Sequence, residues 1–173
     1  MGVMSKTPGD EPLLPQAKAL VDAATAFARR AYLPAASEYP SLGLTKAGGK
    51  EHWDLIVSVA AVYIAAARLN NLELGAAREA TLMGVVTEHL EAWDAANALA
   101  CFENCKEFFG KNFEALAARG HEPRFIASDT IGLWLAWNLL ERAPQSDDER
   151  RFVRGVGVAA THGFFGWWDV KAP

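Results

Sequence analysis

Apolar residues recur at spacings of three and four through every long segment of this chain, and strand-forming residues nowhere alternate for long. That period belongs to the α-helix, so we expect an all-α fold without a sheet. The length of 173 residues leaves room for one ordinary domain. The sequence therefore predicts a single-domain bundle of five or six helices over residues 13–173, preceded by a flexible tail over residues 1–12.

The first two predicted helices are separated by a long loop. One helix runs from Pro15 to Leu33 and ends at Pro34, because proline breaks a continuing helix. Residues 34–50 show no period and carry several prolines and glycines, which predicts a loop that packs partly on the bundle. The next helix, Glu51 to Leu69, is apolar nearly all round and should be central.

Residues 73–119 contain no proline, but their apolar stripe changes direction after about Asn97. A straight helix would drift far less, so we expect two helices with a break near residues 94–98. Either Asp94 or Asn97 would cap the second helix. One long helix that changes neighbours midway is the alternative.

The last two helices are predicted from capping patterns. One begins after Ser128 or Asp129 and reaches Arg142. The other begins at a capping box, in which Ser146 and Glu149 would satisfy each other's backbone N–H groups, and continues to about His162.

Composition and charge exclude several classes of protein. Hydrophobic residues make up 51% of the chain and charged residues 22%, which excludes disorder throughout, and the net charge of −4 does not favour nucleic-acid binding. No apolar run approaches the length of a membrane span, and no signal peptide is evident. The two cysteines, Cys101 and Cys105, fit free thiols in a reducing compartment. We therefore expect a cytoplasmic protein with no nucleic-acid or membrane partner.

Motifs for catalysis and cofactors are incomplete. Residues 155–160 spell GxGxxA, but a capping box precedes them where a dinucleotide site needs a strand, so glycines that permit close helix packing are the better interpretation. No Glu-x-x-His pattern, no histidine pair four residues apart and no GxSxG element occurs. The sequence thus predicts no metal, no cofactor and no catalytic residue.

His89 lies on an apolar helix face together with Val86, Trp93 and Asn97. A polar ring on such a face needs a partner or a cavity. The 34–50 loop is long enough to reach over this face and place Tyr39 there. One interpretation is a pocket for a small, mostly apolar ligand, and the alternative is a core histidine bonded to another helix.

Aromatic residues gather near the C-terminus: Phe164, Phe165, Trp167 and Trp168. Adjacent pairs cannot all face inward from one helix, so we expect some of them to anchor an interface. Plain core packing is the alternative. The leading functional prediction is a non-catalytic interaction or scaffold protein that forms a homo-oligomer, most simply a homodimer, or binds another protein. A ligand-binding protein with a pocket at His89 is the second class, and an enzyme ranks third.

Overall fold

The computed structural model describes residues 13–120 and 123–169, which form six α-helices and one short 3-10 helix, without a strand. This confirms the all-α bundle. The tail predicted for residues 1–12 lies outside the described residues. The elements, in chain order, are α1 (Leu13–Glu38), η1 (Pro40–Leu42), α2 (Gly49–Leu69), α3 (Ala76–Trp93), α4 (Ala98–Ala118), α5 (Pro123–Leu140) and α6 (Asp147–Phe164).

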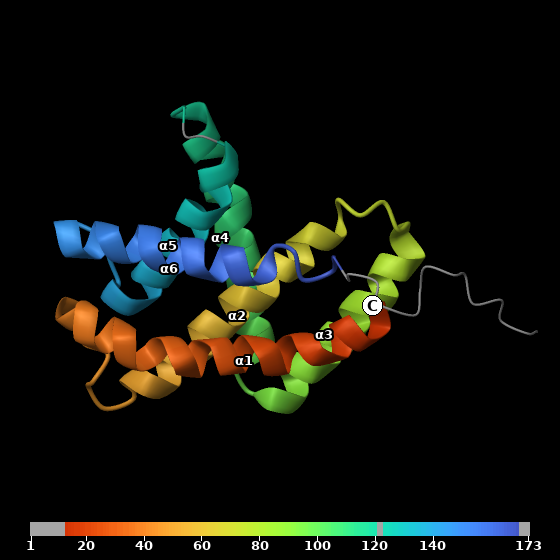
Figure 1. Cartoon of the computed structure of the whole chain (residues 1–173), viewed down its shortest axis with the longest axis horizontal. Coiled ribbons are helices and arrows are strands. Elements are labelled where there is room, and N and C mark those ends of the chain that lie inside the picture. Colours follow the sequence, from red (N-terminus) through yellow and green to blue (C-terminus); the bar gives the residue numbers. More distant parts are fainter. Residues whose placement is uncertain (1–12, 121–122, 170–173) are drawn as a thin grey trace, which may run out of the picture.

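Helix α2 is the centre of the bundle. It contacts α1, α4, α5 and α6, and Figure 1 shows it crossing behind α1 and the α5–α6 pair. Its Trp53 is fully buried, and the indole N–H donates to the carbonyl oxygen of Ala28 on α1 over 2.8 Å. An apolar surface nearly all round suits a helix with neighbours on several sides.

The apolar character of α2 corrects one expectation from the sequence. This helix has 21 residues and contains an 18-residue stretch with a mean hydropathy of 1.3, so it is long and apolar enough to cross a membrane. However, 72% of that apolar stretch is buried inside the bundle. The core helix of a soluble protein meets the same criteria of length and hydropathy. The fold is therefore compatible with a soluble protein.

Helix α1 continues through Pro34 to Glu38, so the predicted end at Leu33 was wrong. Proline cannot donate to the carbonyl of Arg30, but both residues are exposed, and water can satisfy that oxygen. The loop is consequently shorter than expected and begins with η1. As expected, it packs on the bundle, since Leu42 and Leu44 are buried.

Residues 94–97 separate α3 from α4, which confirms the predicted break. The Asp94 carboxylate accepts hydrogen bonds from the backbone N–H groups of Ala96 and Asn97, each at 3.2 Å. Asn97 occupies the N-cap position of α4 but makes no capping bond with its side chain. Asp94 is thus the residue that organises the turn.

Helix α5 begins at Pro123, so the predicted start after Ser128 or Asp129 was wrong. Proline is favoured in the first turn, where its missing N–H has no cost. The Ser128 hydroxyl instead donates to the carbonyl of Phe125 over 3.1 Å, and the Asp129 carboxylate accepts from Arg154 of α6 over 2.8 Å.

Glycines allow α5 and α6 to pack closely. A Cβ atom at Gly157 would collide with the carbonyl oxygen of Ser128, and one at Gly132 would collide with that of Val153. Gly157 belongs to the GxGxxA sequence, so its role is close helix packing, as expected. Figure 1 shows the two helices side by side.

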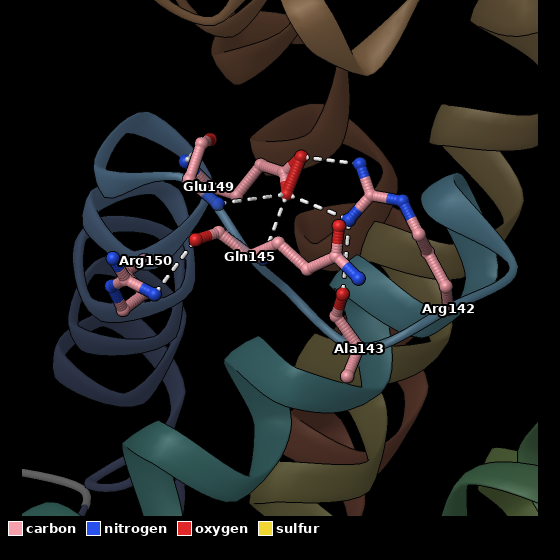
Figure 2. A network of polar contacts seen from close by, with 6 residues as sticks. Arg142, Ala143, Gln145, Glu149 and Arg150 are labelled. Carbon is pink, nitrogen blue, oxygen red and sulfur yellow. Dashed lines mark hydrogen bonds and ion pairs between the residues drawn. The ribbon is translucent and has the colours of Figure 1, made fainter.

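The capping box at the start of α6 is also present. The Ser146 hydroxyl accepts from the backbone N–H of Glu149 over 3.1 Å, and the Glu149 carboxylate accepts from the backbone N–H groups of Gln145 and Ser146. Figure 2 shows that Arg142 approaches the same carboxylate with two nitrogens, at 2.9 and 2.6 Å. The turn between α5 and α6 is therefore closed by one carboxylate.

Candidate functional site

The residues predicted to form a pocket at His89 lie in two regions of the molecule. Val86, His89 and Trp93 are on α3, with Val86 buried and the other two half-buried, and Asn97 is exposed in the turn that follows. Tyr39 instead follows α1 and packs edge-on against Phe152 of α6, with ring centroids 5.3 Å apart. None of the five cavities described in the structure has any of these predicted residues in its lining.

All four C-terminal aromatic residues make contacts within the chain, and the Phe165 ring lies against the guanidinium of Arg68. Phe164 and Trp168 are buried, and the Trp168 indole N–H donates to the carbonyl of Ala65 over 2.6 Å. Trp167 is half-buried and donates to the carbonyl of Gln16 over 2.9 Å. Only Phe165 of the four has a largely exposed side chain, at 47%.

A cavity of about 290 Å³ lies between α2 and α4, and we call it the α2–α4 cavity. Helices α2, α4 and α5, the turn after α2 and the segment after α6 contribute to its lining: Tyr63, Ile64, Ala67, Arg68, Asn71, Phe109, Phe113, Ala127 and Phe165. Residues far apart in the sequence therefore meet at one place.

Aromatic rings form one wall of the α2–α4 cavity. The rings of Tyr63 and Phe109 are 5.1 Å apart, and Phe109 and Phe113 stack at 5.3 Å. The two phenylalanines are four residues apart on α4, so they lie one above the other on the same helix face. Ala67 follows Tyr63 by one turn on the same face of α2 and also lines the cavity, where its small side chain occupies little space.

Arg68 supplies the positive charge of the α2–α4 cavity. Its guanidinium carbon lies 4.7 Å from the centre of the Phe165 ring. The Nε atom is buried and has no hydrogen-bond partner among the described residues. Two arginines of the α5–α6 pair differ, since Arg142 pairs with Glu149 and Arg154 pairs with Asp129. The charge of Arg68 is thus without a carboxylate partner in the described part of the chain.

Two neutral polar groups accompany this charge. Burial raises the pKa of Tyr63 to about 12, so its hydroxyl keeps its proton near neutral pH. That hydroxyl makes no hydrogen bond to a described residue, and the side chain of Asn71 also lines the cavity. The α2–α4 cavity therefore combines apolar walls with a cation and hydrogen-bond donors, which complements a small apolar anion.

The two cysteines give little support for nucleophilic chemistry. Burial raises the pKa of the Cys101 thiol to about 12 and that of Cys105 well above its ordinary value, so both are protonated near neutral pH. Within the described residues, no group of three or more histidine, cysteine and acidic side chains is arranged to hold a metal ion.

Sequence reasoning missed Tyr63, Arg68 and Asn71. The available signal was a single arginine near the end of a helix that is otherwise apolar nearly all round. That signal predicts only a charge with apolar neighbours and does not indicate which distant helix completes a site.

No protein-family model, curated protein or solved structure matches this chain. The residues of the α2–α4 cavity are therefore the basis for a proposal about function.

Proposed function

We propose that this protein is a non-catalytic, cytoplasmic binding protein for a small apolar carboxylate, held in the α2–α4 cavity. One observation carries the proposal: the Arg68 guanidinium has no carboxylate partner among the described residues, although it lines an aromatic cavity. A charge in apolar surroundings is costly unless it is paired and hydrogen-bonded. A ligand carboxylate would supply the acceptors that Arg68 lacks.

The size and surface of the cavity favour a small ligand. Its volume of about 290 Å³ lies at the lower end of the range of ligand sites. Phe113 and Phe165 are among the large hydrophobic residues with exposed side chains, at 37% and 47%, and both line the cavity. An aromatic or short aliphatic group in the cavity would cover both rings, so apolar burial and charge pairing favour the same ligand.

The free state of both cysteines supports the cytoplasmic part of the proposal. Neither Cys101 nor Cys105 is in a disulfide bond. Free thiols are the usual state in a reducing compartment.

Isothermal titration calorimetry with phenylacetate, and with its neutral counterpart phenylacetamide, tests this function. The wild-type chain should bind phenylacetate saturably and phenylacetamide much more weakly. Replacing Arg68 by Met keeps an unbranched apolar side chain of similar shape up to the fourth atom and removes the charged guanidinium. Because hydrogen bonds to charged groups contribute about 1.5–3 kcal/mol, this variant should lose at least about tenfold in affinity for phenylacetate.

Arg30→Met is the matched control, since Arg30 is exposed on α1. Its affinity for phenylacetate should equal that of the wild type. Equal binding of phenylacetate by the wild type and by Arg68→Met, or no saturable binding at millimolar phenylacetate, would contradict the proposal.

Self-association is a second proposal, and the exposed ring of Phe165 supports it. Large aromatic side chains are frequent anchors of protein interfaces. The same ring lines the α2–α4 cavity, so ligand binding and association through Phe165 would compete.

A further inference from the structure

A second, shallower cavity of about 200 Å³ lies between α4 and α5. Its lining consists of Asn104, Phe108, Trp134, Trp137 and Asn138. None of these residues lines the α2–α4 cavity, so the two sites are separate. We call this second cavity the Trp137 recess, because the Trp137 side chain is 44% exposed there.

The buried Trp134 fixes the orientation of both asparagine side chains. Its indole N–H donates to Oδ1 of Asn104 over 2.9 Å, and its backbone carbonyl accepts from Nδ2 of Asn138 over 2.8 Å. An indole N–H can only donate and a carbonyl oxygen can only accept. Each amide therefore has one orientation that satisfies its bond to Trp134.

These two bonds leave complementary groups beside Trp137. Asn104 retains its amide NH₂ group as a donor, and Asn138 retains its amide oxygen as an acceptor. Neither group forms another hydrogen bond with a described residue. Because Trp134 is only 1% exposed and holds both amides, the donor and the acceptor are positioned before any ligand arrives.

We propose that the Trp137 recess binds a neutral pyranose sugar. A hydroxyl group both donates and accepts, so two neighbouring ring hydroxyls match one amide N–H and one amide oxygen. The C–H face of a pyranose is apolar and slightly positive, and it can stack on an indole, whose face is negative. No charged side chain lines the recess, which favours a neutral ligand over a nucleotide with its phosphates.

Saturation-transfer NMR on the full chain tests this site, with three probes: methyl β-glucopyranoside, methyl α-mannopyranoside and methyl β-galactopyranoside. At least one glycoside should receive saturation at its ring C–H protons. Trp137→Ala should lower the association constant at least about tenfold, because the stacking surface is lost, whereas Trp137→Phe should retain part of the binding. The exposure of Trp137 means that Trp137→Ala should keep the fold, which circular dichroism checks.

Asn138→Leu removes the acceptor and should also weaken glycoside binding. Arg68→Met, which alters only the α2–α4 cavity, should leave glycoside binding unchanged and serves as the matched control. The proposal is overturned if no glycoside receives more saturation from the wild type than from Trp137→Ala. It is also overturned if adenosine binds at Trp137 and the glycosides do not, since the recess would then recognise a base.

Discussion

Glu149 is a buried carboxylate that closes the turn between α5 and α6. The hydrogen bonds from Arg142, and then those from the backbone of Gln145 and Ser146, lower its pKa to about 2. The side chain therefore stays ionised well below the usual range of a glutamate. Its negative charge lies in the first turn of α6, where it stabilises the helix by interacting with the positive end of the helix dipole.

The stability of the fold should depend on pH through Glu149. Since its pKa is lowered on folding from an ordinary 4.5 to about 2, the ionised carboxylate stabilises the fold above about pH 4.5. This contribution is lost as the pH falls from 4.5 towards 2. In urea denaturation between about pH 5 and 3, the wild type should lose more stability than Glu149→Gln. Equal losses of stability in the wild type and in Glu149→Gln would contradict this role of Glu149.

Ser146 offers a second test at the residue scale. Ser146→Ala removes the acceptor for the backbone N–H of Glu149 and should lower the free energy of unfolding by about 1 kcal/mol. Ser37→Ala, at an exposed position within α1, is the control and should change stability little. Chemical denaturation compares the two variants. An unchanged midpoint for Ser146→Ala would mean that the cap contributes nothing to α6.

At the scale of helices, α5 and α6 form a close pair that depends on small residues. Gly132 and Gly157 each face a carbonyl oxygen of the other helix without space for a Cβ atom. Close approach of two backbones excludes water and brings Arg154 of α6 to Asp129 of α5. Glycine in a helix usually reduces stability, so its presence here reflects the contact between the helices.

Gly157→Ala and Gly110→Ala should therefore have opposite effects. A methyl group at Gly157 would force the backbones apart and should cost about 1–3 kcal/mol. A Cβ atom at Gly110 on α4 meets nothing within 4 Å, and this variant should gain about 0.5–1 kcal/mol from higher helix propensity. Thermal or urea denaturation measures both. A stabilising Gly157→Ala would contradict the close packing of α5 and α6.

Local signals in the sequence predicted some helix boundaries and not others. The break at Asp94 was predictable because the apolar stripe changes phase there, and the start of α6 because its capping box is complete within four residues. Pro34 was misleading, since an exposed proline near a helix end leaves a carbonyl that water can satisfy. The start of α5 at Pro123 was missed because Ser128 resembles a cap while its hydroxyl bonds back within the helix.

At the scale of the whole molecule, the candidate site was beyond sequence reasoning. The prediction around His89 used residues on one helix face and Tyr39 of the loop after the first helix, whereas the α2–α4 cavity assembles residues from α2, α4, α5 and the segment after α6. No spacing along the chain links Arg68 to Phe113 or Phe165. Only the packing of α2 against α4 creates the space between them.

Self-association is a property of the whole molecule, and sedimentation velocity tests it. We expect a dimer at micromolar concentration that becomes a monomer in Phe165→Ser and in saturating phenylacetate. Trp168→Ser should instead destabilise the fold, because its ring is buried and its indole N–H is bonded to Ala65. A wild type that stays monomeric at every concentration tested would exclude self-association. A dimer that Phe165→Ser leaves unchanged would place the interface elsewhere.

The most direct test of the proposed function is the NMR signal of the Arg68 Nε–H group, assigned by its loss in Arg68→Met. The Nε atom has no acceptor among the described residues, so a bound carboxylate should shift this signal strongly downfield and slow its exchange with water. Titration with phenylacetate should produce both changes, and phenylacetamide should produce neither. An Arg68 signal that stays in place while phenylacetate saturates the protein would contradict a carboxylate site in the α2–α4 cavity.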